Sequence, residues 1–340
     1  MPVPSAPDAV PAALPHLTLA REALDRSGAE REDPGLLGRL AADPATGVLH
    51  LVGGRAPVRD GALVLVPPAG PFPPEAVFLG RRLTDAAAPS AAGRPLVLVA
   101  RESAPGSSGD GGPTRPAEPT DAPTRDPLAG AAWLGLRDVA AGLSDADTGL
   151  FVEAVAIANW HAGHGFCSRC GGRTDTESAG WVRRCRDCSA RHFPRTDPAV
   201  IMAVMDDQDR ILLGSNAAWP AGRHSCLAGF VEPGESLEHA VAREVLEEAG
   251  IVVVDAAYRG SQPWPFPRSL MVGYRAHALP GQEPVADGHE IRSVRWFTRD
   301  ELAAEVRAGA VTLPGAVSIA RALIEDWYGG TLPDPTTLIS

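Results

Sequence analysis

The sequence predicts an α/β protein in three parts: an N-terminal α+β domain, a small four-cysteine module and a C-terminal domain of strands and helices. Three observations predict this organisation. Short apolar runs rich in β-branched residues fill the first hundred residues, two Cys-x-x-Cys pairs lie near the middle, and strand-like runs surround an amphipathic helix in the last part. A chain of 340 residues exceeds the usual size of one domain, which agrees with two domains and a small module.

The composition argues against several functional classes. A formal charge of −11 disfavours general nucleic-acid binding, because phosphate contacts need clustered Lys and Arg. No apolar run is long enough for a membrane helix, and the N-terminus is a poor match to a signal peptide. Four of the five cysteines are paired at metal-ligand spacing, which suits a reducing compartment better than a disulfide framework. We therefore expect a cytoplasmic protein with no membrane partner.

The first part, residues 1–100, is expected to be the N-terminal α+β domain, after a flexible tail of about 14 residues. Its strands are predicted from apolar runs between Gly, Pro and Asp, at 48–52, 61–67, 76–80 and 95–100. No catalytic constellation is visible in it. Residues 101–129 are dense in Pro, Gly, Ser and Thr and cannot bury enough apolar surface to fold, which predicts a disordered linker.

The second part begins with a connecting segment, residues 130–164, in which apolar spacing predicts a helix over 148–164. Residues 165–195 then carry two Cys-x-x-Cys pairs separated by fourteen residues, a spacing typical of structural zinc. Four thiolates leave no open coordination position, so we expect one structural Zn²⁺ held by Cys167, Cys170, Cys185 and Cys188.

Several alternatives stay open for this module. Disulfides or chance spacing compete with zinc, and His161 and His164 are close enough in sequence to compete as ligands. The local arginines keep nucleic-acid binding open, although a module of this kind more commonly holds two domains together. The fifth cysteine, Cys226, lies far from the pairs and is expected to be a buried structural thiol.

The stretch from Gly229 to Ile251 predicts a loop, a helix and a loop. Ser236 is a plausible N-cap and Gly250 a plausible C′ residue. Three glutamates at i, i+3 and i+4 share one helix face, and the opposite face is expected to pack on the core through Ala242, Val245, Leu246 and Ala249. Clustered carboxylates repel one another unless a cation neutralises them, and hard oxygen ligands suit Mg²⁺ or Mn²⁺. The alternative is an ordinary acidic surface helix.

The spacing in this stretch resembles the signature of the Nudix hydrolases at nine positions: Gly229, Glu235, Arg243, Glu244, Val245, Glu247, Glu248, Gly250 and Ile251. The resemblance implies an α/β/α sandwich over residues 196–330 and a Nudix-like N-terminal domain. It also implies that a diphosphate is cleaved with the help of divalent metal ions.

A second stretch, Ser261–Ser269, alternates three prolines with two aromatic residues. This pattern predicts a rigid extended loop with flat apolar faces for a planar ring, and the alternative is a turn whose aromatic residues cap the core. Together with the zinc module, the stretch resembles the NADH pyrophosphatases, the NudC-like branch of the family. The branch hydrolyses NAD(H) to nicotinamide mononucleotide and AMP, some members remove NAD caps from RNA, and homodimers are common in it.

The resemblance also implies roles for particular residues. Glu244 and Glu248 match metal ligands, Glu247 a ligand or proton acceptor, and Glu290 the glutamate that completes the site; Ala228 matches a backbone carbonyl ligand. Arg243 matches a residue that orients the glutamates. The expected substrate-binding residues are Phe193, Phe230, Gln262, Pro263, Trp264, Pro265, Phe266, Pro267, Arg268, Ser269, Ala320 and Arg137.

Two other functions compete with this one. The first is hydrolysis of another dinucleotide such as ADP-ribose, and the second is a catalytically silent Nudix domain that senses nucleotides or binds RNA. The intact set of glutamates disfavours the silent domain. The sequence contains no Walker A loop, no Ser-His-Asp arrangement and no Gly-rich dinucleotide fingerprint.

Overall fold

The computed structural model describes residues 14, 16–21, 24–83, 93–101 and 127–333. The predicted flexible tail and nearly all of the predicted linker 101–129 lie outside these residues. The chain divides into two compact units: unit 1 takes in residues 1–20, 196–264 and 268–340, and unit 2 takes in residues 21–195 and 265–267. No helix among the described residues is both long and apolar enough to cross a membrane.

Unit 2 begins with a mixed seven-stranded sheet in the order β1-β5-β6-β2-β3-β4, with β7 also pairing with β3. Leu36, Phe78 and Val97 belong to the core that the first helix covers. The strands are β1 (Leu24–Asp25), β2 (Gly47–Val52), β3 (Arg55–Arg59), β4 (Ala62–Leu63), β5 (Val77–Arg82), β6 (Pro95–Arg101) and β7 (Ala132–Gly135). The helices are η1 (Gly28–Glu32), α1 (Leu36–Ala42), α2 (Leu136–Val139) and α3 (Asp145–Gly163).

Helix α3 starts three residues before the predicted limit, because Ser144 caps it by accepting a hydrogen bond from the Asp147 N–H at 3.1 Å. It leads into a three-stranded sheet in the order β10-β9-β8, which carries the cysteine pairs. Its elements are β8 (Thr174–Glu177), η3 (Ser178–Gly180), β9 (Val182–Cys185) and β10 (Arg191–His192).

Unit 1 is built on a six-stranded mixed sheet in the order β14-β15-β11-β12-β16, with β13 also pairing with β11. Its strands are β11 (Asp197–Met205), β12 (Ile211–Asn216), β13 (Leu227–Phe230), β14 (Val253–Trp264), β15 (Ser269–Ala278) and β16 (Ile291–Phe297). Its helices are α4 (Leu237–Ala249), α5 (Arg299–Arg307) and α6 (Ile319–Tyr328).

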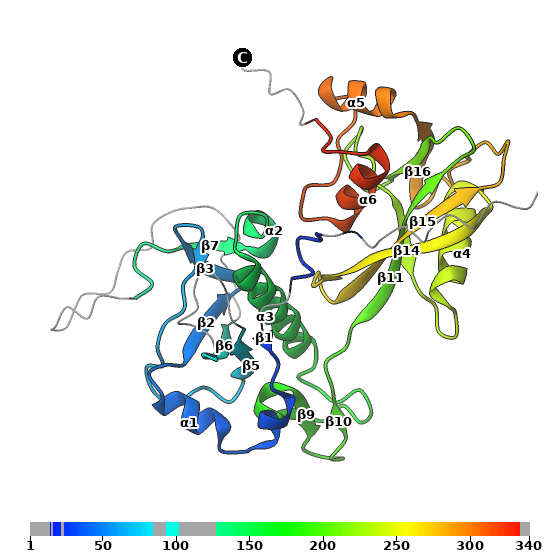
Figure 1. Cartoon of the computed structure of the whole chain (residues 1–340). Helices are drawn as coiled ribbons and strands as arrows, with labels where there is room; N and C mark the ends of the chain where they lie inside the picture. The colour runs from blue at the N-terminus through cyan, green and yellow to red at the C-terminus, as the bar shows by residue number, and fades with distance from the viewer. Residues whose placement is uncertain (1–13, 15, 22–23, 84–92, 102–126, 334–340) are drawn as a thin grey trace, which may run out of the picture. The chain divides into compact units, whose positions relative to one another are not determined.

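Side-chain alternation along β11 divides the core of unit 1 into two layers. Val200, Met202 and Val204 enter the layer beneath α4, whereas Ile201, Ala203 and Met205 enter the layer beneath α5 and α6. Figure 1 shows α4 on one side of the sheet and the other two helices on the opposite side. The α/β fold class is confirmed, and this unit has the predicted α/β/α layers.

The N-terminal segment belongs to unit 1, although the sequence analysis assigned it to the first domain. The Leu17 side chain is buried in the layer beneath α6, and the Leu19 N–H donates to the Gln262 side chain at 3.1 Å. These contacts join residues more than two hundred positions apart, a separation that local sequence patterns do not reveal. The other predicted domain limits stay predictions.

Candidate active site and zinc site

Helix α4 is positioned by its two ends. The Ser236 hydroxyl accepts a hydrogen bond from the His239 N–H at 3.2 Å, and Gly250 closes the helix with a φ of 66°, a conformation that favours glycine. Both predicted caps are therefore confirmed. The helix covers one core layer of unit 1 and projects its glutamates beside the end of β13.

The face of α4 that packs on the core differs from the prediction. Leu246 is 51% exposed, whereas Glu248 is only 4% exposed and lies beside the buried stripe formed by Val241, Val245 and Ala249. Residue 248 follows Val241 by seven positions, which is close to two helical turns, so its side chain falls on the same side. The prediction of an acidic face opposite the core was wrong for Glu248.

Burial gives Glu248 an unusual electrostatic environment. Its pKa is raised to about 8, first by loss of solvent and then by the negative charges of Glu244, Glu290 and Asp287. Its Oε2 atom is buried and has no hydrogen-bond partner. A buried carboxylate oxygen without a partner is costly, and a bound cation would satisfy it. This site therefore fits the divalent metal that the sequence predicts.

Arg243 holds the surrounding carboxylates and backbone in place. Its guanidinium binds Glu235 with two hydrogen bonds, of 2.8 and 2.9 Å, in the bidentate arrangement that arginine favours. It also donates to Glu244 at 2.9 Å, to Glu247 at 3.0 Å and to the Phe230 carbonyl at 2.9 Å. The same ion pair lowers the pKa of Glu235 to about 2. Arg243 therefore has the orienting contacts that the sequence predicts for it.

Gly229 is required by the approach of Glu244. A Cβ atom at position 229 would lie 1.9 Å from the Glu244 carboxyl carbon, well inside any real contact. Glycine at this position therefore lets the carboxylate lie against the backbone of β13. Burial raises the pKa of Glu244, while its hydrogen bond to Arg243 acts in the opposite direction.

A cleft of about 390 Å³ in unit 1 brings several of the predicted residues together. Its lining is Ala199, Ala228, Gly229, Phe230, Glu232, Arg243, Glu244, Ser269, Met271 and Glu290. Phe230 is 60% exposed, so its ring is accessible at the cleft. The cleft combines carboxylates, an exposed aromatic ring and an arginine, a combination suited to a charged ligand that carries a planar ring.

Asp287, which is not among the predicted site residues, positions the turn that carries Glu290. Its carboxylate accepts hydrogen bonds from the backbone N–H groups of His289, Glu290 and Ile291, at 2.9, 3.2 and 2.9 Å. These bonds shape the turn that carries Glu290 and lower the pKa of Asp287. The signal was the Asp-Gly pair at 287–288, which is typical of a turn closed by an aspartate side chain.

The proline-aromatic stretch forms a hairpin turn between strands and is not an extended loop. Strand β14 continues to Trp264 and β15 starts at Ser269, so only residues 265–268 connect them. The Gln262 side chain is fully buried, and its Nε2 donates to the Val317 carbonyl at 3.0 Å. Arg268 is paired with Asp197 at 2.7 Å. Pairing along the strands therefore overrides the rigidity expected from the prolines.

The turn residues 265–267 belong to unit 2, where two predicted substrate residues meet. The guanidinium carbon of Arg137 lies 3.9 Å from the centre of the Phe266 ring. Asn159 donates to the carbonyls of Pro265 and Pro267 at 2.9 and 3.2 Å. Phe193 also belongs to unit 2 and is 59% exposed, whereas Ala320 is buried in unit 1 beneath α6. Their contacts with substrate stay predictions.

The four cysteines of unit 2 form a compact metal-binding group. Among the described residues, they alone form a set of three or more His, Cys, Asp or Glu whose ligand atoms all lie within 4.8 Å of one another. The sulfur atoms of Cys167 and Cys188 are 3.7 Å apart, and those of Cys170 and Cys185 are 3.4 Å apart. Tetrahedral zinc thiolates place sulfur atoms about 3.8 Å apart, so this set fits zinc.

The histidines close to the cysteines have other partners. His161 contacts the Gly180 carbonyl at 2.8 Å and Arg183 at 2.9 Å, and His164 contacts the Trp160 carbonyl at 2.7 Å. His192, which the sequence analysis did not single out, lies 3.2 Å from the Cys167 sulfur and can donate a hydrogen bond to it. The four cysteines are therefore the ligand set, with His192 as an outer partner.

Comparisons with known proteins divide the chain in a similar way. Residues 195–313 match the NUDIX domain, and residues 162–193 match the NADH pyrophosphatase zinc ribbon domain. The NAD-capped RNA hydrolase NudC of Mycobacterium tuberculosis strain H37Rv is 45% identical over 213 residues, which cover 60% of this chain and 68% of that protein.

Two further similarities concern more distant proteins. Human NAD-capped RNA hydrolase NUDT12 is 40% identical over 197 residues, which cover 54% of this chain and 42% of that protein. A crystal structure of a NUDIX hydrolase from Nitrosomonas europaea is 25% identical, with a TM-score of 0.34, and the match covers 49% of this chain and 94% of that one. The family match over residues 162–193 identifies the four-cysteine module as a zinc ribbon.

Proposed function

Because the chain belongs to the NudC branch of the Nudix hydrolases, we propose that it hydrolyses the pyrophosphate bond of NAD(H) to nicotinamide mononucleotide and AMP. The observation that carries this proposal is the cleft that Glu244 and Glu290 both line. The buried Oε2 atom of Glu248, which has no hydrogen-bond partner, supports it. A site with this concentration of negative charge binds a diphosphate only when cations offset the charge.

We assign the divalent metal ions to Glu244, Glu247, Glu248 and Glu290, together with the Ala228 carbonyl, and we propose Mg²⁺ or Mn²⁺. Such ions, when bound, neutralise the pyrophosphate and lower the pKa of water. Arg243 keeps Glu244 and Glu247 in position, and the turn closed by Asp287 keeps Glu290 in position. Phe230 presents an aromatic surface for a ring of the dinucleotide.

The group that accepts the proton must be accessible to water, and this condition reduces the number of glutamates that can act as the base. The Glu247 side chain is 61% exposed and Glu290 is also exposed, whereas Glu248 is buried. In the proposed reaction, water oxygen bonds to one phosphorus while that phosphorus separates from the bridging oxygen. Glu247 or Glu290 accepts a proton of the attacking water, and the bridging oxygen stays with the other nucleotide.

The names of the relatives favour a second substrate. The mycobacterial and human proteins are both named NAD-capped RNA hydrolases. A cap of this kind contains the same pyrophosphate as free NAD, so the same carboxylates would serve both reactions. We therefore propose NAD-capped RNA as a further substrate.

The test compares release of AMP from NADH, NAD⁺ and ADP-ribose at equal concentration, with Mg²⁺ or Mn²⁺ supplied. We expect NADH or NAD⁺ to have the highest kcat/KM. Equal or greater activity on ADP-ribose would overturn the assignment of substrate and favour a Nudix hydrolase of another dinucleotide. An inactive wild-type protein with both metals present would favour a catalytically silent regulator.

Two further proposals concern the setting of the protein. Five free thiols among the described residues, four of them assigned to zinc, suit a reducing compartment, and we propose the cytoplasm. We also propose a homodimer, as expected for this branch. Sedimentation analysis of the zinc-loaded full chain would reveal the dimer, and a monomer at micromolar concentration would exclude it.

A further inference from the structure

The zinc ribbon carries a pair of arginines that face each other across two of its strands. Arg191 on β10 lies directly opposite Arg184 on β9, and Asp175 on β8 lies opposite Arg184 on the other side. Directly paired residues of neighbouring strands point to the same face of a sheet. The register therefore sets two positive charges against each other across β9 and β10, which is unfavourable for the sheet.

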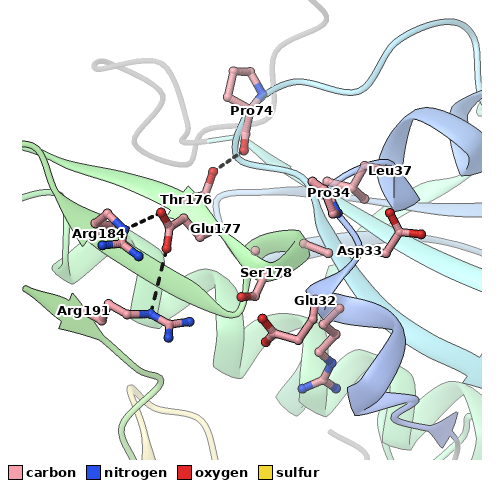
Figure 2. A pocket seen from close by; sticks show the side chains of 13 residues that line it. Glu32, Asp33, Pro34, Leu37, Pro74, Thr176, Glu177, Ser178, Arg184 and Arg191 are labelled. Atoms are coloured by element: carbon pink, nitrogen blue, oxygen red, sulfur yellow. Dashed lines mark hydrogen bonds and ion pairs between the residues drawn. The ribbon is translucent and has the colours of Figure 1, made fainter. Parts of the chain in front are cut away.

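One carboxylate lies between the two arginines. Glu177 is 2.5 Å from Arg184 and 3.9 Å from Arg191. Figure 2 shows its carboxylate linked to both side chains. The neighbouring Arg186 is occupied by Asp175. The side chains of Arg184 and Arg191 are 44% and 41% exposed, and exposed ion pairs contribute little to stability. Two cations against a single anion leave positive charge that is accessible to a ligand.

A hollow of about 560 Å³ in unit 2 adjoins these arginines. Arg184, Arg191 and Glu177 line the ribbon side of the hollow, whereas Arg31, Glu32 and Asp33 come from the segment that precedes α1. Figure 2 shows Glu32 and Asp33 across from the ribbon arginines, and the Arg31 guanidinium stacks on Trp181 at 3.6 Å. Asp33 is occupied by Arg39 at 2.5 Å. An anionic ligand in this hollow would therefore place its phosphates along the ribbon wall.

The charge of the ribbon contrasts with that of the whole chain. Residues 165–195 contain seven arginines and three acidic residues, in a protein whose formal charge is −11. Cations remain in excess even with the double negative charge of four thiolates on Zn²⁺. The overall negative charge disfavours general nucleic-acid binding. A locally basic surface on such a protein suits a polyanion that a second site on the same protein also binds.

We propose that Arg184 and Arg191 bind the phosphate backbone of the RNA chain that follows the cap of NAD-capped RNA. The inference rests on the proposed function, because it gives the second substrate its own contact surface. Phe193, an expected substrate-stacking residue, lies next in the chain after β10, with the guanidinium carbon of Arg191 5.5 Å from its ring. A substrate ring stacked on Phe193 would therefore lie close to Arg191.

The test is the double variant Arg184→Gln/Arg191→Gln in the zinc-loaded full chain. Two exposed arginines outside the ribbon give the charge-matched control, Arg101→Gln/Arg307→Gln. We expect kcat/KM for a short NAD-capped RNA to fall by about tenfold in the ribbon variant, and the slope of log KM against log salt to fall by about 1.4, the value for two lost phosphate contacts on a single strand. Activity on NADH should stay within about twofold in both variants.

A variant with the opposite expected sign excludes a merely structural role. Glu177→Gln removes the anion that competes for both arginines, so the affinity for RNA should rise by about threefold. A structural role would predict the reverse, since the variant breaks two ion pairs. Arg184→Lys/Arg191→Lys keeps the charge and should restore most of the RNA activity.

Direct binding separates this inference from the proposed function. The probe is the same RNA with a 5′-monophosphate in place of the cap. Fluorescence anisotropy measures its binding to wild type and to the ribbon variant. Weaker binding by the variant supports the surface even if the protein hydrolyses neither substrate. Equal binding by the two proteins, or equal losses on NADH and on capped RNA, would overturn it.

Discussion

The two metal sites of this protein are built on opposite principles. In the ribbon, four sulfur atoms lie within 4.8 Å of one another, and tight turns and strand pairs hold the cysteines. In unit 1, Arg243 binds Glu244 and Glu247, and the nearby Glu248 is buried with one carboxylate oxygen, Oε2, that has no hydrogen-bond partner. The first arrangement would leave no open coordination position on a tetrahedral ion, whereas the second leaves carboxylate oxygens beside a cavity. The contrast is therefore between a closed set of ligands and a set that remains open to a ligand in the cleft.

Removal of a thiolate should have the largest effect on stability. Cys185→Ser leaves three sulfur ligands, and structural zinc contributes about 10 kcal/mol or more to the folding of small metal modules. We expect loss of zinc and unfolding of the ribbon, measured by elemental analysis and thermal melting. Cys226→Ala is the matched control, because Cys226 lies in the core of unit 1 and should leave the zinc content unchanged. Full zinc content in Cys185→Ser would contradict the closed site.

Removal of the buried carboxylate should have the largest effect on turnover. Glu248→Gln keeps the shape but removes the negative charge, so kcat should fall by about three orders of magnitude, the size seen when a main electrostatic stabiliser is lost. The melting temperature of the metal-free protein at neutral pH should not fall, because burial raises the pKa of Glu248 to about 8 and its carboxyl group is then mostly neutral, as glutamine is. Glu283→Gln, at an exposed glutamate of the same unit, is the control. Retained activity would remove Glu248 from the ligand set.

Adding a methyl group at Gly229 on β13 should disturb the cleft without changing the charge of any residue. Gly229→Ala forces the Glu244 carboxylate away from its position, and a displacement of about 1 Å can reduce turnover by about a hundredfold. Steady-state kinetics measure the loss, and circular dichroism checks that the fold persists. Activity equal to that of wild type would mean that the position of Glu244 against the backbone does not matter.

The smallest expected effect comes from a second buried carboxylate, in unit 2. Burial raises the pKa of Glu153 from 4.5 to about 7, even with Arg26 at 3.3 Å and Arg31 nearby. The folded protein keeps this proton up to about pH 7, whereas the unfolded chain releases it near pH 4.5. The associated stability is complete below pH 4.5 and is lost as the pH rises through 7, by about 3 kcal/mol.

Chemical unfolding of unit 2 at several pH values measures this slope. Glu153→Gln should flatten it, because the variant cannot ionise, and should unfold at higher denaturant concentration than wild type at pH 8. The same slope in both proteins would assign the pH dependence to another group. Unlike Glu248, Glu153 has arginines beside it. Comparing Glu248→Gln with Glu153→Gln therefore shows whether a buried carboxylate is stabilised by a metal ion or by a cationic side chain.

The sequence predicts the chemistry of both sites better than their surroundings. The cysteine spacing, the capped helix and the glutamate pattern are local, so spacing alone indicates them. The burial of Glu248 depends on how α4 rests on the sheet, and the burial of Gln262 depends on a segment at the far end of the chain. The apolar side chain of Leu246 predicts a core position, yet packing leaves it exposed. Such features depend on tertiary contacts that periodicity does not encode.

The core around Leu17 combines residues from both ends of the chain, so it cannot form until synthesis on the ribosome is nearly complete. Unit 1 needs Leu17 and Leu19, which emerge first, and Gln262 and α6, which emerge last. Most of unit 2 lies in residues 21–195 and is synthesised before Gln262 and α6, so the segment that precedes it must wait until nearly all of the protein has been translated. A fragment cut at Thr196 would lack that segment and expose the apolar surface it covers, so a truncated catalytic domain should aggregate more readily than the full chain.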